Sequence, residues 1–370
     1  MKENHHWPLF VFFFAVAILR AGSLNPQATI DAWLEGHAGG VAVAIVTESG
    51  VTFYQAGQFS ATDPRPITPD TQFEIGSVTK VFTALLLAES ERLGKVHRDD
   101  PAAKFLLPAD DPAVPALAKV TLLTLATHTS GLPRLPPNFA PANPLDPYAD
   151  YTLENLRAAL RQSAQNVQAP ADYSYSNYGF SVLGQALATA WGKPYAEILR
   201  ERVLDPLGLE KTSISLPGVP APANFAPGHR QETLVPNWTQ EATAPAGGLR
   251  SSTREMAKFL QACLDLRATP LDASLAETAK PLRPLGTQPG FIGLAWHLTT
   301  GKTPIVWQNG ETGGYYSFVG YQLTKKRGIV MLTNSERLVD ALAIKLLKAS
   351  DSSGTKPPVS NQTSERTPSP

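Results

Sequence analysis

The sequence has few of the residues that form disulfides or bind metals. Cys263 is the only cysteine among 370 residues, so no intrachain disulfide can form and a cysteine-rich metal site is excluded. The seven histidines contain no H-E-x-x-H pattern and no close pair beyond His5 and His6 near the N-terminus. We therefore expect no metal ion and no cofactor.

Net charge is also absent. Lysine plus arginine and aspartate plus glutamate number 32 each, which gives a formal charge of +0 at pH 7. Such a chain has no general electrostatic attraction to nucleic acid or to acidic lipid, so we expect a small molecule or the end of a polymer as its partner. A hydrophobic content of 43% is enough to form one large domain or two closely packed ones.

Only one long apolar run is present, over residues 8–19, and the small residues Ala21-Gly22-Ser23 follow it. It is shorter than the ~20 residues that span a bilayer comfortably. We therefore predict a signal peptide over residues 1–23, export to the periplasm or out of the cell, and no stable membrane insertion after cleavage. Arg20 lies close to the expected cleavage site, which leaves an uncleaved membrane anchor as the alternative.

The remaining pattern predicts an α/β fold in which an antiparallel sheet is flanked by helices. Residues 40–46 and 51–57 are separated by a glycine turn and are predicted to form a hairpin. The first of these strands is apolar on both faces, so the sheet should be covered on both sides. Strands predicted over residues 293–298, 315–323 and 328–334 complete the sheet. An amphipathic helix predicted over residues 336–348 can lie on it.

Residues 99–245 are rich in proline and short helical patterns. We interpret them as a mainly helical lobe inserted between two parts of the α/β lobe, residues 24–98 and 246–349. Within the helical lobe, helices are predicted over residues 120–133, 153–165 and 180–191. The last segment, residues 350–370, contains serine, threonine and proline with few apolar residues and is predicted to be disordered.

Residues 73–89 contain the first candidate for chemistry. The apolar spacing from Val78 onward predicts a helix with Ser77 as its cap. Lys80 follows three positions later, so its amine shares a face with the serine hydroxyl and can reach it. A lysine removed from water has a lowered pKa and could accept the serine proton. The alternative is a capping serine followed by a solvated lysine, because the pattern S-x-x-K is weak by itself.

A second candidate is Tyr175, with Asn177 two residues later. On an extended segment their side chains would point into the same cleft. A tyrosine near a lysine can be held partly ionised and shuttle protons, and an asparagine can hold a substrate carbonyl. The alternative is an aromatic-rich entry to a helix.

Five segments together resemble the serine β-lactamase and penicillin-binding-protein-like superfamily, most closely its class C branch. They are Phe73 to Lys80, Leu125 to Pro133, Tyr175-Ser176-Asn177, Gly247-Gly248-Leu249, and Asn309 to Gly314. The branch includes class C β-lactamases, D-alanyl-D-alanine carboxypeptidases, D-aminopeptidases and esterases. The resemblance covers residues 38–349 and implies a β-lactamase/transpeptidase-like fold.

The resemblance also implies roles for individual residues. Ser77 would be the acylated nucleophile, Lys80 and Tyr175 would share the general acid and base work, and Asn177 would orient the substrate. The family's third motif matches Gln308-Asn309-Gly310, whose glycine would let the strand approach the substrate. The backbone amides of Ser77 and Glu311 would form the oxyanion hole.

Two positions depart from the family pattern and argue against strong β-lactamase activity. Gln308 stands where a lysine or histidine is common, and Thr79 stands where class C β-lactamases carry serine or alanine. Lys211 and Lys302 begin Lys-Thr sequences that look like substitutes for the missing cation, although neither is followed by glycine. Arg337 is a candidate for the arginine that recognises a substrate carboxylate in this branch.

The sequence thus predicts an exported serine hydrolase that forms an acyl-enzyme on Ser77 and hydrolyses a β-lactam or a D-alanyl-type amide derived from peptidoglycan. A carboxylesterase of the same fold is one alternative. Another is a sensor that binds β-lactam or peptidoglycan without turnover.

Overall fold

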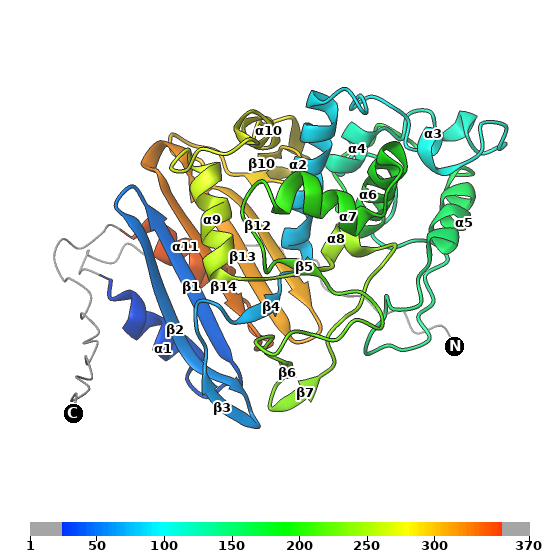
Figure 1. The fold of residues 1–370 in the computed structure, drawn as a ribbon. Coiled ribbons are helices and arrows are strands. Elements are labelled where there is room, and N and C mark those ends of the chain that lie inside the picture. Colours follow the sequence, from blue (N-terminus) through cyan, green and yellow to red (C-terminus); the bar gives the residue numbers. More distant parts are fainter. Residues whose placement is uncertain (1–23, 350–370) are drawn as a thin grey trace, which may run out of the picture.

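The computed structural model of the chain describes residues 24–349 (Figure 1). The predicted signal peptide and the predicted disordered tail lie outside the described residues. The described chain forms a nine-stranded sheet in the order β3-β2-β1-β14-β13-β12-β11-β10-β9, and each pair of neighbouring strands is antiparallel. The predicted α/β fold, an antiparallel sheet flanked by helices, is confirmed.

Most of the predicted strands are present in this sheet. The hairpin corresponds to β1 and β2, and the last two predicted strands correspond to β13 and β14. The strand predicted over residues 293–298 shrinks to the two residues of β11, because Ala295 takes a positive φ of 66° that interrupts an extended chain. The strands are β1 (Gly40–Thr47), β2 (Gly50–Ser60), β3 (Asp63–Pro66), β9 (Arg283–Leu285), β10 (Gln288–Ile292), β11 (His297–Leu298), β12 (Val306–Thr312), β13 (Tyr315–Gln322) and β14 (Arg327–Thr333).

Strand β1 is apolar on both faces because both faces of the sheet are covered. Val41, Val43 and Ile45 belong to one apolar cluster, together with α1 (Pro26–Leu34) and α11 (Asp340–Lys348). The alternate residues Ala42, Ala44 and Val46 belong to the larger cluster on the other face. That face is covered by α9 (Thr253–Cys263), and α2 (Thr79–Arg92) and α10 (Asp272–Thr278) contribute to the same cluster (Figure 1). Side chains that alternate across a strand therefore fill two separate cores.

The helices of the middle part of the chain lie beyond α2, away from the sheet (Figure 1). Helices are present where residues 153–165 and 180–191 predicted them, as α5 (Leu153–Ser163) and α6 (Asn177–Trp191). The helix predicted over residues 120–133 is much shorter: α4 covers only Leu122–Ala126, and His128 then takes a positive φ of 56° that leaves the helical path. The other helices here are α3 (Ala103–Leu106), α7 (Tyr195–Leu199) with a π-helical continuation (Arg200–Leu204), and α8 (Ala244–Gly247).

Five short strands outside the large sheet were not predicted, and neither were β3, β9 and β10 within it. β4 (Gln72–Glu74), β8 (Leu249–Ser252) and β5 (Ser213–Ile214) form a small sheet beside the Ser77 turn, and β6 (Gly228–Arg230) pairs with β7 (Thr233–Val235). Two to four residues give too little alternation for a period-2 pattern to be recognised. These strands nevertheless position the site, because β4 leads directly into the turn that contains Ser77.

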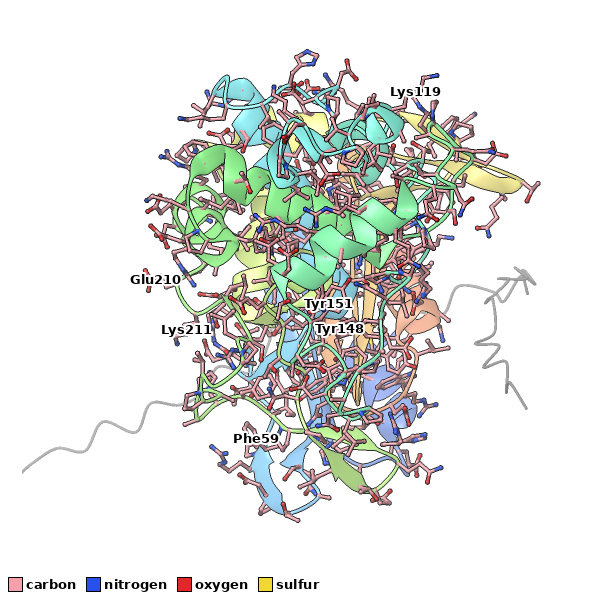
Figure 2. The ribbon with its side chains drawn as sticks, turned by 90° about the vertical axis from the view of Figure 1, so that its right-hand side faces the viewer. Phe59, Lys119, Tyr148, Tyr151, Glu210 and Lys211 are labelled. Atoms are coloured by element: carbon pink, nitrogen blue, oxygen red, sulfur yellow. The ribbon has the colours of Figure 1, made fainter. Side chains whose placement is uncertain are left out.

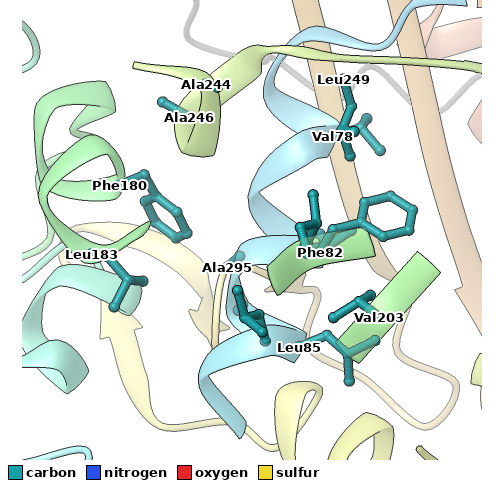
Figure 3. Packing of buried hydrophobic residues seen from close by; sticks show 14 of the residues in the cluster. Val78, Phe82, Leu85, Phe180, Leu183, Val203, Ala244, Ala246, Leu249 and Ala295 are labelled. Atoms are coloured by element: carbon teal, nitrogen blue, oxygen red, sulfur yellow. The ribbon is translucent and has the colours of Figure 1, made fainter. Parts of the chain in front are cut away.

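Helix α2 lies at the centre of the larger core. All of its residues from Thr79 to Ser90 are buried, so the helix is enclosed on every side rather than along one stripe. Figure 3 shows Val78, Phe82 and Leu85 from this part of the chain between side chains of α6, such as Phe180 and Leu183, and Leu249 of β8. The Phe82 ring lies 4.5 Å from the ring of Phe259 on α9. The packing of α2 thus connects the sheet side to the helical side and fixes the orientation of its first turn.

Replacing Phe82 with alanine tests the dependence of the fold on this helix. We expect Phe82→Ala to lower the free energy of unfolding by about 3–5 kcal/mol, because it leaves a cavity that the surrounding helices cannot fill. Urea denaturation measures the change. Leu145→Ala is the control, since Leu145 is 51% exposed and its loss should change stability by less than about 0.5 kcal/mol. Equal effects of the two substitutions would contradict the central role of α2.

Candidate active site

Ser77 lies in a single 3₁₀ turn (Gly76–Val78) immediately before α2, and it lines a cleft. The prediction that it caps the helix is wrong. The residue before α2 is Val78, and no side chain makes a capping hydrogen bond there. The Ser77 hydroxyl is instead 3.0 Å from the amine of Lys80, so the chain leaves this hydroxyl free for a side-chain partner.

Lys80 is fully buried, and its amine has three oxygen neighbours. Besides Ser77, they are Oδ1 of Asn177 at 2.8 Å and the backbone carbonyl of Ala246 at 2.6 Å. Burial, followed by the nearby charge of Arg134, holds the pKa of Lys80 well below its usual value. An uncharged amine has two N–H donors and one lone pair. Since the amide and carbonyl oxygens can only accept, they would take both donors of the uncharged amine and leave its lone pair for the Ser77 hydroxyl.

Tyr175, which lies just before α6, also approaches the Ser77 hydroxyl. The Lys80 amine lies 4.9 Å from the centre of its ring, and a hydrogen bond with Ser77 lowers its pKa. Burial has the larger effect and raises the pKa of Tyr175 to about 12. The prediction of a partly ionised tyrosine is therefore corrected, because the enclosed phenol keeps its proton at neutral pH.

Asn177 is the first residue of α6. The preceding Ser176 caps this helix, with its hydroxyl accepting from the Gly179 amide at 2.8 Å. The Asn177 amide group lines the cleft while its oxygen holds Lys80. The extended segment and helix start thus bring Tyr175 and Asn177 to the same place, as their spacing predicts.

Strand β12 passes very close to the Ser77 turn. A Cβ atom added to Gly310 would lie 2.1 Å from the carbonyl oxygen of Ile75 and 2.9 Å from the Ser77 amide nitrogen. The hydroxyl of Ser317, on the neighbouring strand, donates to the same Ile75 carbonyl at 2.8 Å. Only glycine allows this approach, which brings the backbone of Gly310 and Glu311 against that of Gly76 and Ser77.

Two predicted substrate contacts on this strand need correction. Gln308 is fully buried, and its side-chain amide donates to the carbonyl of Ala295 at 3.1 Å. Asn309 points to the other face of the sheet, where its amide donates to Asp340 of α11 at 2.7 Å. Neither lines the cleft, whereas Glu311 and Thr312 do. Thr79 is also buried, and its hydroxyl accepts from the Leu249 amide at 3.0 Å, so this departure from the family pattern connects α2 to β8.

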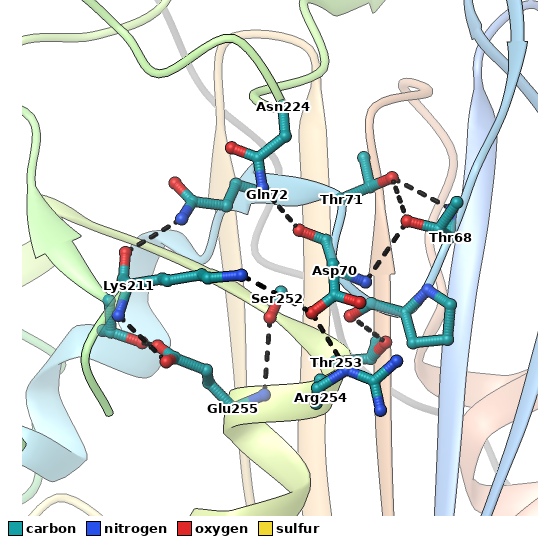
Figure 4. A network of polar contacts seen from close by, with 12 residues as sticks. Thr68, Asp70, Thr71, Gln72, Lys211, Asn224, Ser252, Thr253, Arg254 and Glu255 are labelled. Carbon is teal, nitrogen blue, oxygen red and sulfur yellow. Dashed lines mark hydrogen bonds and ion pairs between the residues drawn. The ribbon is translucent and has the colours of Figure 1, made fainter. Parts of the chain in front are cut away.

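The cations that looked like substitutes for the missing lysine lie elsewhere. Figure 4 shows Lys211 in a polar network with Asp70 and Glu255: its amine is 4.0 Å from Asp70, and its backbone amide donates to Glu255 at 2.9 Å. Arg337 contacts α1, with its guanidinium 4.8 Å from the Trp33 ring and 3.1 Å from His37. Lys302 is exposed in the loop before β12. None of the three lines the cleft around Ser77.

The cleft encloses about 380 Å³, including its open mouth. Besides residues already described, its walls come from the proline-rich loops: Leu135, Pro136, Tyr148, Trp238, Gln240 and Thr243. The rings of Tyr148 and Trp238 lie 5.4 Å apart, and Asp146 joins their loops by accepting from the Thr239 amide at 2.8 Å. Figure 2 shows Tyr148 and Tyr151 close together on this side of the molecule. The sequence analysis missed these residues; aromatic side chains within otherwise irregular loops are the signal that could have found them.

His128 is another residue that the sequence analysis did not single out. Its Nδ1 accepts from the Ser176 amide at 3.0 Å, and its carbonyl accepts from the Ser174 amide at 2.8 Å. Its ring lies 4.5 Å from that of Tyr175. Burial is the main cause that holds the pKa of His128 well below its usual value. An uncharged imidazole can act as this acceptor, so His128 positions the Tyr175 segment.

Among residues 24–349, no group of three potential metal-ligating side chains lies close together. At the cleft, a serine hydroxyl lies beside a buried lysine amine and a tyrosine that keeps its proton at neutral pH. This constellation and the surrounding fold define a serine hydrolase.

The comparison with known proteins identifies the family. The model of the β-lactamase family matches residues 26–350, so the chain belongs to this family. It is 26% identical to a β-lactamase of Pseudomonas fluorescens over 82% of this chain and 92% of that protein. It is 28% identical to the D-alanyl-D-alanine-carboxypeptidase/endopeptidase AmpH of Escherichia coli over 72% of each.

Solved structures show the same fold. A class C β-lactamase from Rhodobacter sphaeroides aligns with a TM-score of 0.72 and 24% identity, over 86% of this chain and 96% of that one. A β-lactamase/D-alanine carboxypeptidase from Pseudomonas syringae aligns with a TM-score of 0.71 and 22% identity, over 84% and 93% of the two chains. In the described part of the chain, no helix has the length and apolarity needed to cross a membrane.

The close approach of β12 makes Gly310 a test of the site. We expect Gly310→Ala to reduce kcat/KM by about 10²-fold or more, because the added methyl forces the strand and the Ser77 turn apart and displaces a backbone donor. Gly247→Ala is the matched control: Gly247 also lines the cleft, but its added Cβ would meet its nearest atom at 3.5 Å. Equal activity of the two variants would contradict the proposed importance of this contact.

Glu74 gives the protein a pH-dependent stability. It is buried beneath the cleft, accepts from the Trp238 amide at 2.7 Å, and has its pKa raised by burial from 4.5 to about 8. The folded state therefore holds this proton more tightly than the unfolded state. The resulting stabilisation is fully present below pH 4.5 and is lost as the pH rises through about 8.

We expect Glu74→Gln to remove this contribution. Between pH 5 and 8, the melting temperature of the wild type should fall relative to that of the variant. Because each unit of pKa shift corresponds to about 1.4 kcal/mol, the free energy of unfolding should change by a few kcal/mol over this range. Thermal unfolding at several pH values measures it, with Glu232→Gln as the control because Glu232 is exposed. The same dependence of melting temperature on pH in Glu74→Gln and the wild type would show that the Glu74 carboxyl is already ionised in the folded state.

Proposed function

We propose that the protein is an exported hydrolase in which Ser77 forms an acyl-enzyme with an amide or ester. The observation that supports this most directly is the fully buried Lys80 amine, which lies 3.0 Å from the Ser77 hydroxyl and donates to two carbonyl oxygens. Burial lowers the pKa of this amine, which favours its role as the base for the serine proton. The apolar run over residues 8–19 supports export.

The reaction begins when the Ser77 oxygen attacks the substrate carbonyl carbon and its proton passes to Lys80. The negative charge on the carbonyl oxygen is stabilised by the backbone amides of Ser77 and Glu311. Tyr175 gives its proton to the leaving nitrogen or oxygen as the bond to the carbonyl carbon breaks, and it is reprotonated from Lys80. Water then attacks the carbonyl carbon of the acyl-enzyme, one of its protons passes to Lys80 and on to the Ser77 oxygen as the ester bond breaks, and the acyl group leaves as a carboxylic acid.

A β-lactam or a D-alanyl-type amide is our first substrate class. The names of the relatives, a β-lactamase and a D-alanyl-D-alanine-carboxypeptidase/endopeptidase, support it. A carboxylic ester is the second class, and the buried side chain of Gln308 favours it, because β12 then offers no cation to a substrate carboxylate. A protein that is acylated without turnover is the remaining alternative.

Mass spectrometry of the intact protein tests the proposal. After mixing with benzylpenicillin or with a p-nitrophenyl ester, we expect a mass increase equal to the acyl group on the wild type and none on Ser77→Ala. The peptide containing residues 73–80 should carry the adduct. Ser181→Ala is a matched control, because Ser181 also lines the cleft but its hydroxyl donates to the Asn177 carbonyl at 3.1 Å.

The lifetime of the adduct separates the alternatives. Loss of the adduct at the rate of steady-state hydrolysis identifies an enzyme, and a burst of acylation without turnover identifies a sensor. Undiminished hydrolysis by Ser77→Ala would end the proposal.

A further inference from the structure

Arg134 has no acidic partner among residues 24–349. No described carboxylate forms an ion pair or hydrogen bond with its guanidinium. The side chain is exposed, so that solutes can reach it. A cation without a partner is available to a ligand.

The backbone of Arg134 is held firmly at the start of α6. Its carbonyl accepts from the amides of Asn177 at 3.0 Å and Tyr178 at 3.2 Å. The two residues that follow it, Leu135 and Pro136, line the cleft with Ser77. The position of the guanidinium is therefore tied to the residues that surround the nucleophile.

The guanidinium itself does not line the cleft but lies over the Tyr175 ring, next to the residues that do. Its carbon is 5.2 Å from the centre of the Tyr175 ring, the ring that the Lys80 amine approaches to 4.9 Å. Its charge lowers the pKa of Lys80, and it opposes the larger effect of burial on the pKa of Tyr148. These groups belong to different parts of the chain, so the cation lies where the loop with Tyr148, the segment before α6 and the first turn of α2 meet.

On the β12 side of the cleft, across from Arg134, the charged side chain is acidic. Glu311 on β12 lines the cleft, and its carboxylate accepts from the Tyr316 hydroxyl at 3.0 Å. Burial raises the pKa of Glu311, and the charge of Arg134 acts in the opposite direction. Gln308 is enclosed and neutral, so the β12 side repels an anion and the α6 side attracts one.

We propose that Arg134 is the anion-binding residue of this site and that it binds a carboxylate of the substrate on the α6 side of Ser77. The guanidinium can take both carboxylate oxygens in a bidentate hydrogen-bonded pair. The substrate class becomes an amide or ester with a carboxylate near the reacting carbonyl. This proposal rests on the proposed function, because it requires a substrate that acylates Ser77.

Two pairs of matched esters test it. In the first pair the acyl group is glutaryl or valeryl on a p-nitrophenyl leaving group, which places a carboxylate or a methyl at the end of the acyl chain. In the second pair the acyl group is acetyl, and the leaving nitrophenol does or does not carry a carboxylate. We expect Arg134→Gln to reduce kcat/KM for the anionic member of at least one pair by about 10- to 100-fold, with less than about a twofold change for its neutral partner.

Three variants sharpen the test. Arg134→Lys keeps the charge but not the bidentate geometry and should lie between wild type and Arg134→Gln. Glu311→Gln should improve kcat/KM for the same anionic substrate. Arg283→Gln is the control, because Arg283 is an exposed arginine on the edge strand β9 and does not line the cleft. It should leave kcat/KM unchanged for both ester pairs.

The effect should also weaken as salt is added, since an exposed charge is screened. An equal change for anionic and neutral members in both pairs, together with a shifted pH profile of kcat, would mean that Arg134 acts only through Lys80 and would overturn the proposal. Such a result leaves the Ser77 adduct intact. Failure of the proposed function would instead appear as a missing adduct and as hydrolysis that survives Ser77→Ala.

Discussion

The site depends on a single buried amine. An isolated ammonium in the interior is strongly disfavoured, and Lys80 is fully buried with two carbonyl-type oxygens as its other neighbours. Neither oxygen belongs to a carboxylate, so no countercharge holds the proton on the lysine. The same enclosure that makes the charged form costly places the amine beside Ser77, so burial lowers the pKa of a residue that is normally charged at the surface.

The fold supplies this enclosure from distant parts of the chain. Helix α2 carries Ser77 and Lys80 at its first turn and is packed on all sides, while α6 brings Asn177 and α8 brings the Ala246 carbonyl. Strand β12 closes the other side, where Gly310 allows its backbone to touch the Ser77 turn. Because each element is also part of a continuous core, the site cannot loosen without disturbing packing elsewhere.

Much of this arrangement follows from local sequence patterns, and some of it does not. The period of apolar residues predicts α2, α6 and the β1–β2 hairpin, and three-residue spacing predicts that Lys80 reaches Ser77. Spacing cannot show whether a tyrosine is ionised, since the pKa of Tyr175 depends on burial by residues far along the chain. Nor does a motif show where a side chain lies: Gln308 and Asn309 match the motif, but Gln308 is enclosed against the Ala295 carbonyl and Asn309 lies on the other face of the sheet. The loops with Tyr148 and Trp238 have no period at all, so only their tertiary contacts identify them.

The positions of the charges around the cleft connect the base to substrate binding. A cation at residue 308 would have to be buried, which costs free energy, whereas the exposed guanidinium of Arg134 keeps its hydration. Arg134 also lowers the pKa of Lys80, so it helps to keep the resting amine uncharged. A carboxylate bound to Arg134 would offset that effect and raise the proton affinity of Lys80 when a substrate is present. The lysine would then be uncharged in the free site and a stronger base at the moment when Ser77 must lose its proton.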